Sequence, residues 1–201
     1  MLFAMLFFLS VALRNSETPS TVGTLVQSLA YLCGLALDFP YSPVRLVTLM
    51  LSDDGVASLT VRSAAGTAYM IALVALAIFV VLLRVQDWPA RNGAFNVWVN
   101  LPTFDPTVGG DVVARLERDA RVNLALGFVL PFVIPAILKL GGKGLVTFDP
   151  SSSQTLVWMI TAWAFLPASL LMRGIAMGRI AGMIRQKRTE DGGGPSGLAA
   201  A

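Results

Sequence analysis

The feature that most constrains this chain is an apolar run at residues 65–85, AGTAYMIALVALAIFVVLLRV, which carries a single charge close to its end. A helix of about 20 apolar residues crosses the hydrocarbon core of a bilayer, which is roughly 30 Å thick. Only 13% of the 201 residues are charged, whereas about 25% is usual in soluble domains. The sequence therefore predicts an all-α integral membrane protein.

Other apolar runs predict further spans on both sides of this one. Residues 122–140 and 155–175 form runs of similar length, and residues 21–37 form a shorter run. The apolar start, residues 1–14, rises only about 20 Å as a helix, which is less than a comfortable crossing. We expect a tilted or partly inserted helix there, with a cleaved signal peptide as the alternative. The expected total is four to five transmembrane helices.

These spans divide the chain into four regions. Residues 1–85 form an N-terminal membrane region, and residues 86–121 form an ordered cytoplasmic loop with an extended segment and an amphipathic helix. Residues 122–184 form a second membrane region that continues into a helical extension. Residues 185–201 are rich in glycine and lack apolar bulk, so we expect a disordered tail.

The distribution of lysine and arginine predicts the orientation. With five spans and the N-terminus outside, eleven of these residues, Arg14 among them, lie inside and four lie outside. The positive-inside rule then places the loop and the C-terminus in the cytoplasm. The preference for arginine over lysine and the richness in alanine and valine are typical of a GC-rich bacterial genome, so the expected location is a bacterial inner membrane. Because the cations flank apolar runs instead of forming a stripe, nucleic-acid binding is not expected.

The extended part of the loop contains the sequence AFNVWVNLP, whose alternation of side chains is typical of a strand. Its aromatic residues, with those on either side of it, are candidates for docking on a partner protein. The alternative is that the rings lie at the level of the lipid headgroups. These residues are Trp88, Phe95, Trp98 and Phe104.

The rest of the loop, residues 111–121, predicts an amphipathic helix that Asp111 caps and that runs into the span beginning at Val122. Its apolar residues, Val112, Val113, Leu116 and Ala120, share one face. Acid–base pairs four residues apart, Asp111 with Arg115 and Glu117 with Arg121, would stabilise the helix. The mixed charges favour a protein partner, and a solvated extension is the alternative. The candidate docking residues are Arg115, Glu117 and Arg118.

Small residues and prolines mark the later helices. Gly174, Gly178 and Gly182 follow one another at four-residue steps, which permits close contact with another helix. Pro131 and Pro135 each remove a backbone hydrogen bond and predict a bend in their span. Such a bend is either a fixed kink or a hinge of the kind that transporters use.

The residue types argue against chemistry. The chain has no histidine and one cysteine, Cys33, so the usual ligands of zinc and haem iron are missing. The interiors of the three long runs carry no ionisable residue of the kind that couples ion transport. We predict no catalytic residue, no metal site and no cofactor, with bound lipid, or pigment in a photosynthetic assembly, left open.

These observations favour a non-catalytic accessory or scaffold subunit of a larger inner-membrane complex. Its partners would be other membrane-protein subunits and the lipid bilayer, and it would dock through the cytoplasmic loop and its small-residue helix faces. The alternative is a small transporter or lipid-handling protein that uses the proline-kinked span at residues 122–140.

Overall fold

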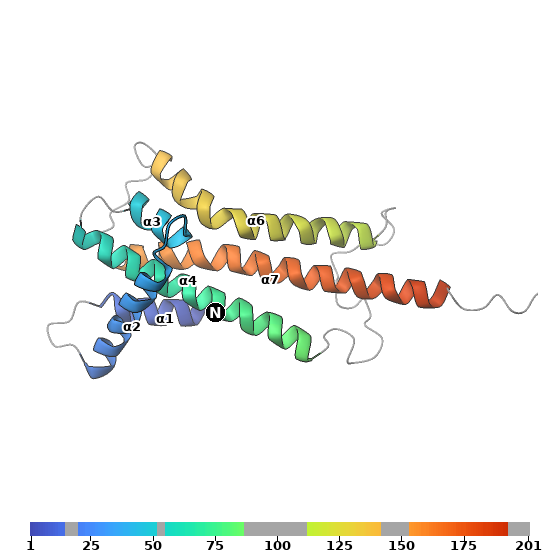
Figure 1. The fold of residues 1–201 in the computed structure, drawn as a ribbon, viewed down its shortest axis with the longest axis horizontal. Coiled ribbons are helices and arrows are strands. Elements are labelled where there is room, and N and C mark those ends of the chain that lie inside the picture. The colour runs from blue at the N-terminus through green and yellow to red at the C-terminus, as the bar shows by residue number, and fades with distance from the viewer. Residues whose placement is uncertain (15–19, 52–54, 87–111, 142–152, 193–201) are drawn as a thin grey trace, which may run out of the picture.

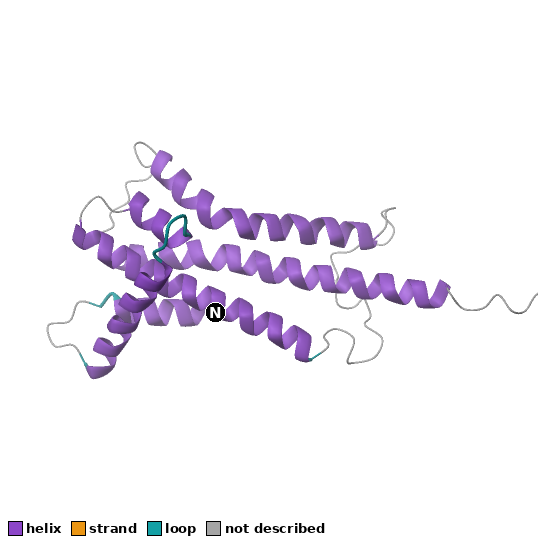
Figure 2. Cartoon of the chain, viewed as in Figure 1, coloured by secondary structure: helices purple, strands orange, loops and turns teal. Residues whose placement is uncertain are grey.

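The computed structural model describes residues 1–14, 20–51, 55–86, 112–141 and 153–192. Within these ranges the regular structure is entirely helical, which confirms the predicted all-α class for this part of the chain (Figure 2). The helices are α1 (Leu2–Ala12), α2 (Thr21–Leu37), α3 (Pro43–Leu51), α4 (Gly55–Val85), α6 (Val112–Gly141) and α7 (Ser153–Gly192).

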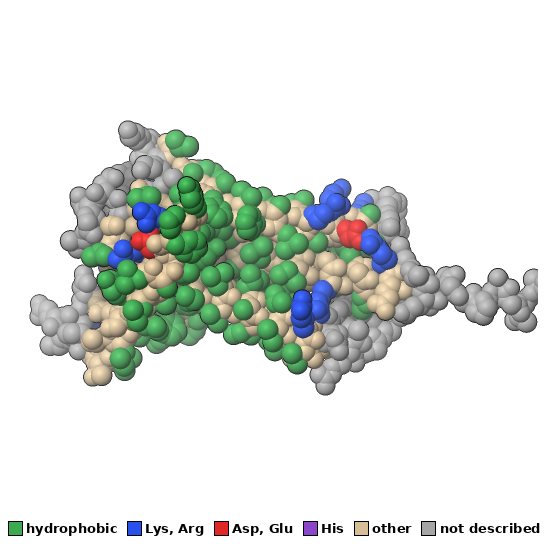
Figure 3. Space-filling model, in the orientation of Figure 1, with side chains coloured by type: hydrophobic (Ala, Val, Ile, Leu, Met, Phe, Trp, Pro, Cys, Tyr) green, Lys and Arg blue, Asp and Glu red, His purple; other side chains and the backbone are tan. Residues whose placement is uncertain are grey.

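Three long helices run side by side along the molecule (Figure 1). Those long and apolar enough to cross a bilayer contain the segments Ser58–Val85, Val112–Ile137 and Ser153–Gln186. Apolar side chains cover the middle of the space-filling surface, and most charged side chains lie toward its two ends (Figure 3). This is the surface of an integral membrane protein, because hydrocarbon solvates the apolar middle and water the charged ends.

The two N-terminal helices are too short to count as spans, so four or five crossings are not confirmed. The 11 residues of α1 rise about 16 Å and the 17 residues of α2 about 25 Å. Helix α2 also lies at a steep angle to the three long helices (Figure 1). Helix α1 runs toward the end of the molecule where α2 and α3 pack, which we call the α2–α3 end.

The direction of α1 changes one sequence-based placement. The side chain of Gln27 in α2 donates a hydrogen bond to the carbonyl oxygen of Arg14, which follows α1. Arg14 therefore lies at the α2–α3 end with Arg45 and Arg62, not on the side of Arg84 as the charge count assumed. With Arg14 moved, the count predicted from the sequence changes from eleven and four to ten and five.

Local signals explain the boundaries of α2 and α3. The Oγ of Ser20 accepts a hydrogen bond from the backbone N–H of Gly23 at 3.1 Å and caps α2. The Oγ of Ser42 accepts in the same way from the N–H of Arg45 at 3.0 Å and caps α3. Between the two helices, Tyr41 adopts a φ of 67°, which is strained for a residue with a side chain and turns the chain sharply.

Small residues bring α2 and α4 into close contact. A Cβ atom on Gly66 would lie 2.5 Å from the Cα of Gly34, so only glycine fits at this crossing. Next to Gly66 along α4, the buried residues Ala64, Ala65 and Ala68 belong to the main core. That core also takes side chains from α1, α3 and α7, and the ring of Tyr69 stacks on Trp163 at a centroid distance of 5.7 Å.

Candidate docking surface

The candidate functional site is the pair of helix ends opposite the α2–α3 end, residues 112–121 of α6 and 174–186 of α7. We call it the paired-helix extension. Both helices continue past the end of α4 (Figure 1). Helix α6 is continuous from Val112 to Gly141, so residues 112–121 and the apolar segment that follows them form one helix.

A small core of its own holds the paired-helix extension together. Val113 and Leu116 of α6 are buried against Ile180 and Ala181 of α7, and Leu116 is completely inaccessible. These α6 residues belong to the apolar face predicted from the sequence, and Ala120 is also buried. The face predicted to be apolar is therefore used for packing within the chain, which leaves the charged faces outside.

The charges on this surface pair differently from the prediction. The carboxylate of Glu117 accepts from Arg185 of α7, while Arg121 donates to the backbone carbonyl of Glu117 at 3.4 Å. Arg118 lies 3.8 Å from Asp119, and their side chains are 70% and 44% exposed. An interhelix pair thus replaces the expected Glu117–Arg121 pair, because Arg185 approaches from the antiparallel helix. Asp111 lies outside the described residues.

An arginine that the sequence did not single out ties α4 to this region. The guanidinium of Arg179 in α7 donates to the carbonyl oxygen of Leu83, in the last turn of α4. Carbonyl groups in a last turn have no partner within their own helix. A basic residue near a helix end is a common partner for them, but here it comes from a helix distant in sequence.

The three glycines of α7 do not share one environment. A Cβ on Gly174 would lie 2.9 Å from the carbonyl oxygen of Ala120, so this glycine permits close packing of α6 on α7. At Gly178 the nearest atom would be the Cβ of Ala120 at 3.9 Å, and at Gly182 nothing lies within 4 Å. Gly174 therefore serves internal packing, while Gly178 and Gly182 are exposed.

Helix α6 bends along its length (Figure 1), and a hydrogen bond from α7 holds its backbone at the prolines. Because Pro135 has no N–H, the carbonyl oxygen of Pro131 loses its helical donor. The indole N–H of Trp163 in α7 donates to that oxygen at 3.0 Å, and the contact is buried. Pro135 itself is fully buried. This arrangement is what a fixed kink requires, and the hinge interpretation stays a prediction.

An apolar cavity of about 150 Å³ lies beside the bend, between α3, α6 and α7. Its lining includes Val47, Ile134, Pro135, Met159 and Trp163. The lining is almost entirely apolar and the pocket is partly open, so it favours a hydrocarbon group over water.

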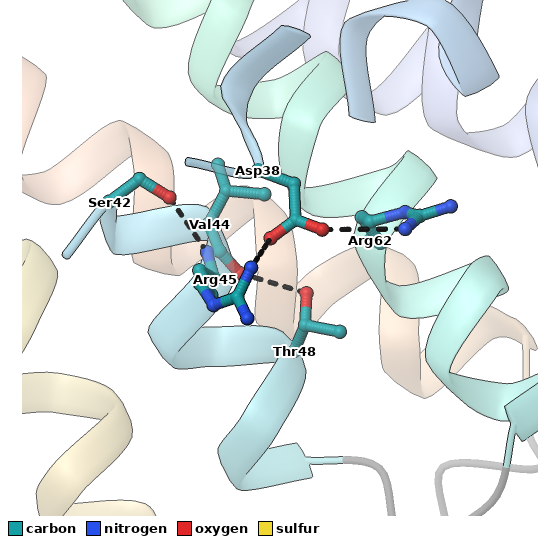
Figure 4. A network of polar contacts seen from close by, with 6 residues as sticks. All are labelled: Asp38, Ser42, Val44, Arg45, Thr48 and Arg62. Atoms are coloured by element: carbon teal, nitrogen blue, oxygen red, sulfur yellow. Dashed lines mark hydrogen bonds and ion pairs between the residues drawn. The ribbon is translucent and has the colours of Figure 1, made fainter. Parts of the chain in front are cut away.

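A second polar cluster lies at the α2–α3 end, where the sequence had indicated only the end of a helix. Asp38, which follows α2, lies between Arg45 of α3 and Arg62 of α4 (Figure 4). Arg62 donates to one carboxylate oxygen at 3.3 Å, and Arg45 lies 3.6 Å from the other. Asp38 and Arg62 are 24 positions apart, and the turn at Tyr41 separates Asp38 from Arg45, so no helical period could have indicated this cluster.

The remaining docking candidates, Trp88, Phe95, Trp98 and Phe104, lie outside the described residues, as does the predicted extended segment. Among the residues that are described, no three histidine, cysteine or acidic side chains are grouped so that they could bind a metal ion. Comparison of the chain with protein-family models, with curated proteins and with solved structures finds no match.

Proposed function

We propose that this chain is a non-catalytic accessory or scaffold subunit of a larger membrane-protein complex, which it joins through the paired-helix extension. The observation that carries the proposal is that residues 112–121 have one face packed within the chain and another face exposed. The apolar side chains pack against α7, whereas Arg118, Asp119 and Arg121 point away from that core. Exposed ionic groups on a preformed helix pair suit a polar protein partner.

The charge balance of this surface favours an acidic partner. Arg185 pairs with Glu117, which leaves Asp119 as the acidic side chain beside Arg115, Arg118 and Arg121 on α6. Long-range attraction of such a cationic surface increases the association rate with an acidic one. The excess of cations at this end also supports a cytoplasmic location for the surface, in a bacterial inner membrane.

The test is native mass spectrometry of the chain extracted from its own membrane in mild detergent. We expect a complex of fixed composition with other membrane proteins. Reversal of one exposed charge, Arg118→Glu, should reduce the amount of complex about fivefold, which corresponds to about 1 kcal/mol for a rim contact. Arg14→Glu is the matched control, because this arginine is exposed at the opposite end. A monomer, or an oligomer of this chain alone, would contradict the proposal.

The apolar cavity beside Pro135 favours a second candidate, a small transporter or lipid-handling protein that uses the kinked span. Its test is flux or lipid transfer in proteoliposomes with Pro131→Ala and Pro135→Ala. A hinge function requires that both substitutions slow transfer. If transfer is unchanged in both variants, the bend is only structural and this second candidate fails.

A further inference from the structure

The polar cluster at the α2–α3 end carries more positive than negative charge. Asp38 is the acidic partner of both Arg45 and Arg62. The side chains of Asp38 and Arg62 are each 19% exposed, whereas that of Arg45 is 48% exposed. One carboxylate neutralises only one of the two guanidinium groups, so the cluster has a net charge of one and an accessible arginine that bears it.

Arg62 also has hydrogen-bonding capacity that its neighbours leave unused. Its Nη1 donates to Asp38, and its guanidinium carbon lies 6.0 Å from the centre of the Tyr31 ring. Its Nε is buried and has no hydrogen-bond partner within the described part of the chain. A buried N–H without an acceptor is unfavourable, and arginine is the side chain best suited to bind a phosphate through several N–H groups.

Exposed aromatic residues lie near this cluster, on α2 and in the turn that precedes α3. Tyr31, Phe39 and Tyr41 are 47%, 53% and 91% exposed, and Phe39 and Tyr41 belong to the turn that joins Asp38 to α3. Tyr41 is also the residue with the strained positive φ. Aromatic residues gather at the depth of the lipid headgroups, and Figure 3 shows charged side chains at the edge of the apolar surface at this end of the molecule.

We propose that the Asp38–Arg45–Arg62 cluster binds the phosphate group of a membrane phospholipid. Arg45 provides the accessible contact, and Arg62 provides buried positive charge behind it. Asp38 orients both arginines but also weakens the attraction for an anion. This inference does not depend on the proposed accessory function, because it concerns the opposite end of the molecule.

Because Asp38 competes with the phosphate for the arginines, substitution of Asp38 and substitution of Arg45 should change lipid affinity in opposite directions. Purified chain in neutral detergent is titrated with phosphatidylglycerol, and the midpoint of thermal unfolding is followed by circular dichroism. Arg45→Gln should weaken lipid binding about threefold, as expected for a partly exposed ion pair. Asp38→Asn should strengthen it by a similar factor, because both arginines then lack a competing carboxylate. Arg45→Lys should retain most of the affinity.

Three controls distinguish phospholipid binding at this cluster from binding elsewhere on the chain and from binding of a free anion. Arg14→Gln, at the same end but outside the cluster, should bind phosphatidylglycerol like the unmodified chain. Diacylglycerol, which lacks the phosphate, should produce no shift. Inorganic phosphate alone should also produce none, and an equal shift with it would refute a lipid ligand. If Asp38→Asn weakens binding as Arg45→Gln does, or if no variant changes it, the cluster is purely structural and the proposal is wrong.

Discussion

The two ends of the molecule use charged side chains in different ways. At the α2–α3 end, Asp38 and Arg62 are mostly buried and hold together elements that are distant in sequence. In the paired-helix extension, Arg118 and Asp119 are exposed neighbours on one helix. Partial burial strengthens an ionic interaction and makes its loss costly, whereas water and salt screen an exposed pair.

Packing is also more extensive at the α2–α3 end than in the paired-helix extension. Four helices contribute to the main core near the α2–α3 end, while two helices share the small core of Val113, Leu116, Ile180 and Ala181. Substitutions should therefore disturb the whole fold at the first end and only the local helix pair at the second. At the first end charge and packing stabilise the fold, whereas at the second end the charged side chains are left on the surface that we propose for docking.

The largest effect should come from Gly66→Leu. A side chain at this position collides with the backbone of Gly34 at a distance of 2.5 Å from the first added carbon. Overpacking against backbone should lower the free energy of unfolding by about 3 kcal/mol or more and separate α2 from α4. Thermal unfolding in detergent measures this loss. Gly182→Ala is the matched control and should cost nothing, because no atom lies within 4 Å of the added methyl group.

Leu116→Ala should have the next largest effect, and the effect should be local. Removal of a fully buried leucine costs about 2–3 kcal/mol. Because the small core involves only two helices, we expect faster hydrogen exchange in residues 112–121 and 177–186, with no change in α4 before its last turn, where Arg179 donates to Leu83. Val122→Ala, on an exposed position of the same helix, is the control. Faster exchange throughout the chain would show that the two ends are not independent.

Trp163→Phe should lower stability by about 1–2 kcal/mol, because the carbonyl oxygen of Pro131 loses its donor. The same substitution at Trp158, which is 56% exposed on the same helix, should change stability by less than about 0.5 kcal/mol. Thermal unfolding of the two variants gives the comparison. Equal losses would mean that the indole hydrogen bond does not fasten the bend.

Glu117→Gln should have the smallest effect, about 0–1 kcal/mol, because its partner Arg185 is 64% exposed. Any loss should decrease as salt is added. The double variant with Arg185→Gln should be no less stable than Glu117→Gln alone if the pair accounts for the effect. If the variant loses more than about 2 kcal/mol of stability and salt does not reduce this loss, the Glu117–Arg185 pair behaves like the mostly buried Asp38–Arg62 pair and the contrast between the two ends is wrong.

The sequence best predicted the features that depend on the residues of a single helix. The uninterrupted runs predicted the spans within α4, α6 and α7, and the periodicity of Val113, Leu116 and Ala120 predicted the buried face of α6. Hydropathy and helical period are local properties, so they do not depend on how the helices pack against one another. The same reasoning predicted a shorter span at residues 21–37, which is not confirmed, because hydropathy says little about the angle at which a helix lies.

Contacts between helices could not be predicted in this way. Trp163 and Arg179 of α7 form hydrogen bonds with α6 and α4, respectively. Asp38, which follows α2, pairs with Arg45 of α3, seven positions later. Which of three equally spaced glycines is buried depends on where α6 crosses α7. The register between helices decides these contacts, and the pattern along one helix does not contain it.

The continuity of α6 has a mechanical consequence. Its 30 residues form one helix about 45 Å long, and Trp163 fixes its bend from α7. The stretch between the paired-helix extension and the bend contains no break that could absorb a rotation. If the proposed partner tilts the extension, the membrane segment of α6 therefore tilts with it. Binding outside the bilayer would in this way set the angle of α6 inside it.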